Sequence, residues 1–188
     1  FMPFDRIGGQ EKAVAILRHA LRNGRLAHAY LFIGPEGVGK RLAALTLFKA
    51  MNCQSPPEPG DCCEKCPPCL KANSSNHADL IVLEPEGETI KIDQVRDMQR
   101  RLRFRPMEGG RRACILDSAD GLNDAASNAL LKTLEEPPQE THLFLITSRP
   151  YKLLPTILSR CQWVKFKPLA PGQIAQILQE AQGLEKEK

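Results

Sequence analysis

Long apolar runs are missing from this chain of 188 residues: no stretch of about 18 apolar residues, the length of a membrane-spanning helix, occurs in it. The first residues also contain no apolar core of the kind found in a secretory signal. These absences argue against a membrane or secreted protein and predict a cytoplasmic one. Apolar residues make up 42% of the chain and charged residues 26%, which predicts a folded domain with a sizeable core.

A strong excess of one charge is missing too, because the formal net charge is only +4. Nucleic-acid binders are recognised by clustered positive charge rather than by a small overall excess, so this value identifies no such binder. Positive charge is clustered in one segment, residues 96–112, where the arginines are Arg96, Arg100, Arg101, Arg103, Arg105, Arg111 and Arg112.

Paired cysteines are not expected, because the chain has seven cysteines, an odd number, and no export signal. Four of them follow the spacing C-x9-C-x2-C-x2-C, which can close a tetrahedral site of four thiolates around Zn²⁺. Cys62 is a fifth candidate that could replace the cysteine beside it, but the chosen register keeps two successive C-x2-C steps. We therefore predict a structural zinc module at about residues 53–73, with the ligands Cys53, Cys63, Cys66 and Cys69.

Helical and extended patterns alternate along the chain. Apolar spacing and capping residues predict helices at residues 10–23, 40–51, 93–102, 124–134 and 172–182, with Asp93 and Asn123 as N-caps of the third and fourth. Short apolar runs predict strands at residues 30–33, 80–83, 113–117, 143–146 and 162–167, the last at an edge. Nearly continuous apolar strands are typical of a parallel sheet covered on both faces, so we expect a doubly wound α/β fold. Residues 52–76 are expected to form an insertion outside the core.

A phosphate-binding loop follows the first of these strands and opens a helix. Its glycines let backbone N–H groups point at an anion, and its lysine can reach a terminal phosphate. The next residue is Arg41, where a Ser or Thr normally holds Mg²⁺. The loop predicts binding of ATP or ADP, and a tight turn without a ligand is the alternative. The candidate residues are Gly34, Pro35, Gly37, Val38, Gly39, Lys40 and Arg41.

A second departure from a hydrolytic site lies at the end of the strand at residues 113–117. Asp117 fits the carboxylate that supports the Mg²⁺ shell in a P-loop enzyme. Ser118 occupies the next position, where an acid would orient the attacking water, and a hydroxyl cannot act as a base near neutral pH. Both departures affect hydrolysis rather than binding, so we expect weak or no hydrolysis by this chain alone.

Arg160 is a candidate for a role outside its own nucleotide site. It lies in a Ser-Arg-Cys sequence on a loop between a short predicted helix that begins near Pro155 and the strand from residue 162. An arginine on such a loop can reach a phosphate held by a neighbouring subunit, or it can pair with an acid on the surface. The position alone gives both alternatives equal weight.

Together these motifs resemble the AAA+ clamp-loader subunits of bacterial DNA polymerase III, most closely the delta-prime branch. The resemblance covers nearly the whole chain. It rests on residues 4–10 (FDRIGGQ), residues 26–32 (LAHAYLF), the cysteine module, residues 128–138 (NALLKTLEEPP) and residues 159–161 (SRC).

The resemblance implies an AAA+ domain at residues 2–167, the start of a helical lid domain at residues 168–188, and a collar domain beyond it. It also implies a hetero-pentameric ring with gamma/tau and delta subunits, which places a sliding clamp on primer-template DNA during replication. Gamma/tau subunits hydrolyse ATP in that family, whereas delta-prime subunits are stationary and supply the Ser-Arg-Cys arginine in trans, a role that would fall on Arg160.

Arg41 and Ser118 favour the stationary type, a non-catalytic subunit of the nucleotidyltransferase holoenzyme. An ATP-hydrolysing gamma/tau-type subunit is the alternative. The modest net charge speaks against a free-standing DNA-binding module. Residues 96–112 could meet primer-template DNA, acids on a partner or only solvent, and solvent is the usual surrounding of exposed charge.

Overall fold

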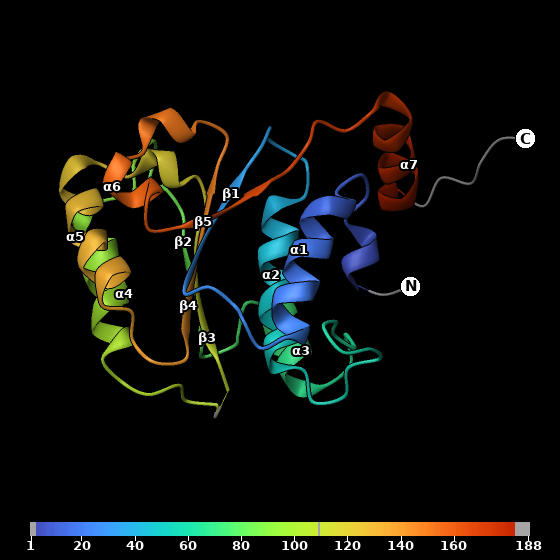
Figure 1. The fold of residues 1–188 in the computed structure, drawn as a ribbon, viewed down its shortest axis with the longest axis horizontal. Coiled ribbons are helices and arrows are strands. Elements are labelled where there is room, and N and C mark those ends of the chain that lie inside the picture. Colours follow the sequence, from blue (N-terminus) through green and yellow to red (C-terminus); the bar gives the residue numbers. More distant parts are fainter. Residues whose placement is uncertain (1–2, 109, 183–188) are drawn as a thin grey trace, which may run out of the picture.

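A five-stranded parallel sheet forms the centre of the molecule (Figure 1). The computed structural model describes residues 3–108 and 110–182. The strand order is β2-β3-β4-β1-β5, and every pair of neighbours is parallel. Because β1 lies between the later strands β4 and β5, the connections cover both faces, which confirms the predicted doubly wound α/β fold. The strands are β1 (Ala29–Ile33), β2 (Leu80–Leu83), β3 (Arg112–Leu116), β4 (Thr141–Thr147) and β5 (Gln162–Lys165).

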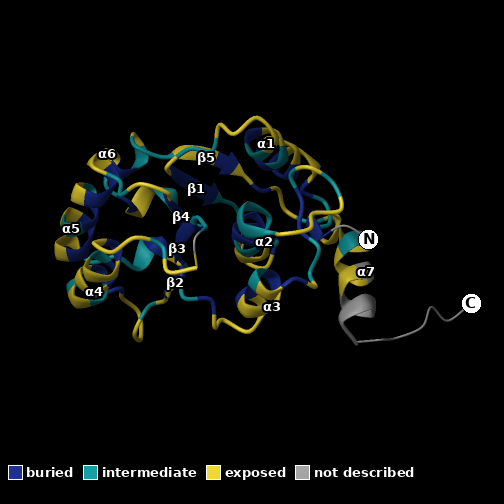
Figure 2. Cartoon of the chain, turned by 90° about the horizontal axis from the view of Figure 1, so that it is seen from below, coloured by how far each residue is buried: buried dark blue, intermediate teal, exposed yellow. Residues whose placement is uncertain are grey.

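Helices cover the two faces of the sheet, with α1, α2 and α3 on one side and α4, α5 and α6 on the other (Figure 1). Alternate residues of β1 explain both layers, because Phe32 belongs to the core cluster that includes α1 and α2, whereas Leu31 belongs to the cluster that includes α4 and α5. Figure 2 shows the strands buried between these layers. The helices are α1 (Glu11–Arg22), α2 (Lys40–Asn52), α3 (Pro67–Asn73), α4 (Ile92–Leu102), α5 (Asp124–Glu135), α6 (Pro155–Leu158) and α7 (Pro171–Gln182), with 3-10 turns at Pro3–Arg6, Ala119–Gly121 and Pro150–Lys152.

The structure corrects one of the two predicted helix caps. Asn123 caps α5 as predicted, since its side chain accepts a hydrogen bond from the Ala126 N–H at 2.8 Å. Asp93 is not the cap of α4, because the helix begins at Ile92 and the extended residue Lys91 precedes it. The Lys91 N–H donates instead to Gln94 Oε1 at 2.9 Å, so the side chain of Gln94 provides the hydrogen-bond acceptor for this backbone N–H before the helix.

The cysteine-rich insertion is more ordered and more buried than its composition indicates. It contains α3, with a proline in its first turn, where the missing N–H costs no hydrogen bond. Ala72 of α3 is 1% exposed and belongs to the same core cluster as α2. The prediction that residues 52–76 lie outside the core is therefore wrong for α3.

The chain leaves β5, the predicted edge strand, and ends its described part in α7. The side chains of Ile174 and Ile177 on this helix are 45% and 38% exposed. Met2 from the predicted AAA+ domain and residues 183–188 from the predicted lid lie outside the described residues. Among the helices that the structure describes, none is long and apolar enough to cross a bilayer.

Candidate nucleotide site and metal centre

The P loop joins β1 to α2 and has the backbone geometry of an anion cradle. Gly37 and Gly39 have φ angles of 76° and 94°, a left-handed region that favours glycine. Alternation of such residues with ordinary ones turns successive N–H groups toward one point. Gly34 is needed for a different reason, because a Cβ there would lie 2.6 Å from the Phe166 carbonyl oxygen. The P loop is thus packed against Phe166, directly after β5, and its backbone conformation is suited to binding an anion through its N–H groups.

Lys40 is the first residue of α2 and is 7% exposed. Its Nζ donates to the carbonyl oxygen of Gly34 at 2.6 Å and also to that of Pro35. Burial lowers the pKa of Lys40, while the charges of nearby acids, Asp117 among them, oppose that shift.

A cavity of about 360 Å³ lies beside Lys40, at the carboxyl ends of β3 and β4. Ligands of open α/β sheets bind at this edge. The cavity is lined by Glu36, Gly37, Gly39, Lys40, Arg41, Leu42, Asp117, Ser118, Asp120, Ile146, Thr147, Ser148 and Arg149.

Arg41 follows the P-loop lysine, at the position where a Ser or Thr normally holds Mg²⁺. Its Nη1 donates to Asp117 at 3.0 Å and to Glu84, so one guanidinium bridges the ends of β2 and β3. Partial burial disfavours the charge of Arg41, but the two hydrogen bonds and the carboxylate charges outweigh it and raise the pKa of Arg41. The predicted carboxylate Asp117 is therefore engaged by a cation of its own chain. Together with the missing hydroxyl at position 41, this donor set does not fit Mg²⁺.

A further part of the cavity wall escaped the sequence prediction. The side chain of Asp120 is 3% exposed, and it accepts hydrogen bonds from the Thr147 hydroxyl and from Arg149 Nε, both at 2.7 Å. Burial opposes ionisation of this acid, but these bonds lower the pKa of Asp120. Thr147 and Arg149 could have been predicted from their position after the strand at residues 143–146, because the carboxyl ends of parallel strands lie together beside the ligand site.

Arg160 lies far from this cavity, toward the amino ends of the strands. It precedes β5, whose Gln162 and Lys165 stand opposite Tyr30 and Ile33 of β1. The length of β5 from Gln162 to Lys165 alone therefore places Arg160 about 10 Å from the carboxyl end of β1, where the P loop begins. Arg160 Nη2 donates to Glu135 of α5 at 2.8 Å, and the two side chains are 34% and 51% exposed.

The structure brings the four predicted cysteines together. The Sγ atoms of Cys53, Cys63, Cys66 and Cys69 all lie within 4.8 Å of one another, with Cys66 3.4 Å from Cys69 and 3.9 Å from Cys53. Four thiolates around one Zn²⁺ at 2.3 Å would be about 3.8 Å apart, so the donor set fits a tetrahedral ion. Cys62 is not in this group, and its thiol instead lies 3.8 Å from Glu64.

Burial and backbone hydrogen bonds act in opposite directions on these thiols. The backbone N–H of Lys65, helped by that of Cys66, lowers the pKa of Cys63 to about 6. Burial raises the pKa of Cys69, and it raises that of Cys62 to about 12. A bound cation would offset this burial cost for the clustered thiolates, whereas Cys62 has the environment of a neutral buried thiol.

Ion pairs attach the cysteine module to the two helices beneath it. Lys49 of α2 is 3% exposed and contacts Glu64, and it also donates to Asn73 at 2.9 Å. Arg18 of α1 contacts Asp61 at 2.5 Å. The module is therefore held against the face of the domain formed by α1 and α2.

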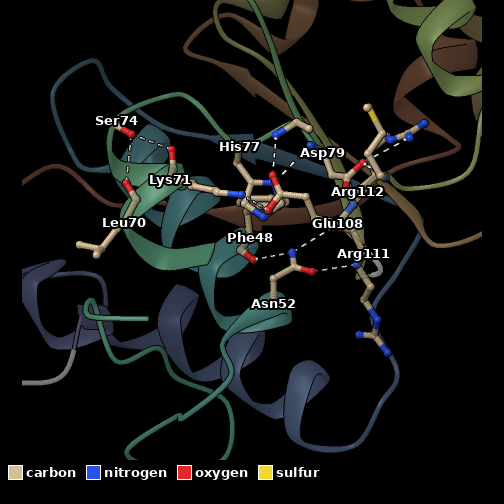
Figure 3. Close-up of polar contacts among 12 residues, drawn as sticks. Phe48, Asn52, Leu70, Lys71, Ser74, His77, Asp79, Glu108, Arg111 and Arg112 are labelled. Carbon is tan, nitrogen blue, oxygen red and sulfur yellow. Dashed lines mark hydrogen bonds and ion pairs between the residues drawn. The ribbon is translucent and has the colours of Figure 1, made fainter. Parts of the chain in front are cut away.

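The arginine-rich segment is not one continuous basic surface, because Arg112 is buried. Figure 3 shows Arg112 beside Asp79, and their side chains are 4% and 0% exposed. Asp79 accepts the backbone N–H groups of Met107 and Glu108 at 2.8 Å each. Arg112 donates to one backbone carbonyl in the last turn of α4 and to two in the loop after it, those of Arg101, Phe104 and Arg105. The interpretation of Arg112 as a surface contact is thus wrong; it fixes the loop. Arg96 and Arg100 are exposed and pair with acids one helical turn away.

The sheet order, the P loop before α2 and the strand-end carboxylate agree with a fold of the AAA+ type. A family model described as "DNA polymerase III, delta subunit" matches residues 9–170. The chain therefore belongs to this family of DNA polymerase III clamp-loader subunits, as its motifs predicted.

Curated relatives from two branches of the family match the chain. It is 40% identical over 166 residues to the delta' subunit of Bacillus subtilis, covering 88% of this chain and 50% of that protein. It is 45% identical over 137 residues to the delta' subunit of Pseudomonas aeruginosa, with 72% and 42% covered. It is also 38% identical over 173 residues to the tau subunit of Bacillus subtilis, with 91% and 30% covered. The chain spans half or less of the length of these relatives, and both branches match it.

Solved structures give the same fold. A gamma subunit-related protein of DNA polymerase III from Thermotoga maritima superposes with a TM-score of 0.64 at 26% identity, covering 89% of this chain and 49% of that one. The RuvB branch migration motor of the same organism superposes with a TM-score of 0.59 at 18% identity, covering 94% and 51%. The second likeness is one of fold alone.

Proposed function

We propose that this chain is a stator-like clamp-loader subunit of the replicative DNA polymerase III holoenzyme. It supplies Arg160 to the nucleotide site of a neighbouring motor subunit and hydrolyses little or no ATP itself. The observation that carries the proposal is the contact of Arg41 with both Asp117 and Glu84, which leaves the strand-end carboxylate engaged. A motor site needs that carboxylate for the magnesium shell and a further acid for the water, and position 118 is a serine.

The position of Arg160 supports action in trans. The P loop of the same chain lies at the carboxyl ends of the strands, whereas Arg160 lies toward their amino ends, so its side chain cannot reach that loop. Its ion pair with Glu135 is exposed, and exposed pairs contribute only about 0–1 kcal/mol, so its transfer to a phosphate of a neighbour costs little. Arg is suited to this role, because its planar fork can donate two parallel hydrogen bonds to a phosphate.

The P loop retains the parts that bind phosphate. Gly34, Pro35, Gly37, Val38, Gly39 and Lys40 would hold ATP or ADP, with Arg41 and Asp117 at the end of the phosphate chain. This division of roles, binding without efficient turnover, agrees with a subunit that is stationary while its neighbours cycle.

The cysteine cluster supports a structural role for Zn²⁺. Cys53, Cys63, Cys66 and Cys69 would complete a four-coordinate site, which keeps no open position for a substrate. The ion would fix the module against α1 and α2, and thereby the end of the helix that begins at the P loop.

The proposed partners follow from the family. They are the gamma/tau and delta subunits in a hetero-pentameric ring, with the sliding clamp and primer-template DNA reached through the assembly. Residues 168–188 would begin the helical lid domain, and the exposed side chains of Ile174 and Ile177 on α7 are suited to further packing within it.

Turnover of ATP by the purified chain with Mg²⁺ separates this role from that of a motor subunit. We expect phosphate release no faster than that of a Lys40→Ala variant, because neither protein can assemble the metal and water shell. Metal-dependent turnover that the Lys40→Ala change abolishes would instead favour a gamma/tau-type motor subunit, for which the retained Gly39 and Lys40 are the supporting residues.

A further inference from the structure

The charges around the cavity differ in how they are compensated. Arg149 is paired with buried Asp120 at 2.6 Å, and Arg41 is paired with two carboxylates. Lys40 donates to two carbonyl oxygens, which carry no net charge. Among the described residues Lys40 forms no ion pair with a carboxylate, although the charges of Glu36, Asp117 and Asp120 act on it. Its ammonium group can therefore turn toward an anion in the cavity, beside the guanidinium of Arg41.

A divalent ion has no suitable position beside this arrangement. Mg²⁺ requires an octahedral shell of oxygens at about 2.0–2.1 Å, and a guanidinium offers donors but no acceptor. The carboxylate of Asp117 already faces Arg41 at 3.0 Å. An ion bound at Asp117 while Arg41 keeps its contact would lie beside a positive charge, which is unfavourable.

Arg41 can itself contact a phosphate. Both of its hydrogen bonds to carboxylates leave from Nη1, and a guanidinium has five N–H donors in one plane. Arginine forks match the geometry of phosphate oxygens and form strong charge-assisted hydrogen bonds with them. The residue that follows the P-loop lysine is close enough in sequence to meet the same phosphate chain.

We propose that this cavity binds a nucleoside di- or triphosphate without a divalent metal, and that Arg41 supplies the positive charge that Mg²⁺ supplies in a motor site. The proposal rests on the proposed function in taking the P loop as a nucleotide site without turnover. It adds that the bound nucleotide carries no divalent metal, and that Arg41 neutralises the phosphate charge in place of the metal.

Equilibrium binding of ADP and ATP, measured by calorimetry with excess Mg²⁺ and again in buffer without added divalent metal, tests the proposal. We expect the two dissociation constants of the unchanged chain to agree within about threefold, much less than the tenfold change that 1.4 kcal/mol gives. Arg41→Thr should lose affinity without added metal and recover it with Mg²⁺, a metal dependence of about tenfold or more. Lys40→Ala should lose binding in both conditions, whereas Arg96→Ala, which changes an exposed arginine on α4, should leave both constants unchanged.

Two results would overturn the proposal. One is nucleotide binding that Mg²⁺ strengthens by about tenfold or more in the unchanged chain. The other is no binding of ADP or ATP in either condition at millimolar nucleotide. Neither result affects the stator role, because a chain with an empty P loop can still supply Arg160 to a neighbour, and the turnover assay tests that role separately.

Discussion

Asp79 and Arg112 illustrate, at the scale of single residues, how buried charge stabilises a loop in this domain. Their side chains are almost completely buried, and the carboxylate also accepts two backbone N–H groups from residues 107 and 108. Removal of one partner from a buried pair leaves the other charge uncompensated, which costs about 3–5 kcal/mol. The connection between α4 and β3 therefore depends on the carboxylate of Asp79, the residue immediately before β2.

Asp79→Asn should accordingly lower the free energy of unfolding by about 3–5 kcal/mol, measured by urea denaturation. The amide would place N–H groups against the donors of Arg112 and the loop. Asp93→Asn is the matched control, because its pair with Arg96 is exposed, and we expect a loss of no more than about 0.5 kcal/mol. Equal losses in the two variants would contradict this account of the loop.

His142 is a residue whose burial makes stability depend on pH. Burial lowers the pKa of His142, although its hydrogen bond to the Ala27 carbonyl at 2.8 Å opposes the shift. The unfolded chain takes up the proton near the ordinary value of about 6.5, before the folded chain does. The contribution of neutral, buried His142 to the free energy of unfolding is therefore fully present above about pH 6.5. It is lost as the pH decreases from there toward the lowered pKa of His142 in the folded chain.

Chemical denaturation at about pH 7.5 and about pH 5.5 tests this dependence, because the two conditions lie on either side of the unfolded histidine pKa. His142→Gln should reduce the loss of stability on acidification. His19→Gln, a change at an exposed position, should leave it unchanged, and His77 should account for part of the remainder because burial lowers its pKa too. An acid dependence that His142→Gln does not alter would contradict the assignment.

At the scale of elements, α2 connects the two candidate sites. Lys40 is its first residue and Cys53 follows its last, so the P loop and the cysteine cluster lie at opposite ends of one helix. A bound metal would fix the C-terminal end of α2, and the ion pair of Lys49 with Glu64 supports that end from within the helix. The module is thus expected to stabilise the domain as a whole and not only its own loops.

Metal content of freshly purified protein tests the cluster, with about one equivalent of zinc per chain expected. Cys63→Ala should lose the metal and lower the melting temperature, because its Sγ belongs to the group of four. Cys62→Ala should keep the metal, since that thiol lies outside the group. Loss of zinc from the Cys62 variant alone, or much less than one equivalent in the unchanged chain, would contradict the predicted ligand set.

The elements that the sequence predicted well are those whose signal is local. Apolar runs identified all five strands, and the side chain of Asn123 identified the start of α5. The Cys and Pro content concealed α3, whose burial depends on α2. Asp93 was predicted as a cap because Asp is a common N-cap residue, but the helix begins one residue earlier, where the Gln94 side chain accepts the Lys91 N–H. The cysteine spacing predicted which thiols come together, as the structure shows.

Contacts between remote segments could not be predicted in the same way. The substitution at Arg41 was visible in the sequence, but its bridge to Asp117 and Glu84 depends on the parallel order of β2 and β3. The buried pair of Arg112 and Asp79 was missed because seven arginines in one segment look alike without their partners.

At the scale of the whole molecule, the parallel sheet separates the two proposed sites. The cavity with Lys40 and Arg41 lies at the carboxyl edge, and Arg160 lies toward the amino ends of the same strands. One chain can therefore present a phosphate site at the carboxyl ends of its strands and an arginine to a neighbouring subunit near their amino ends. This separation is the physical basis of the proposed role in a ring.

The most direct test of that role is ATP hydrolysis by a reconstituted clamp loader in which the motor site next to this chain is the only competent one. With assembly confirmed by size-exclusion chromatography, Arg160→Ala should lower clamp- and DNA-stimulated turnover by roughly a thousandfold, the contribution typical of an arginine finger. Glu135→Gln, which removes only the surface partner of Arg160, should leave turnover near normal. Normal turnover with Arg160→Ala in an intact complex would contradict the central claim.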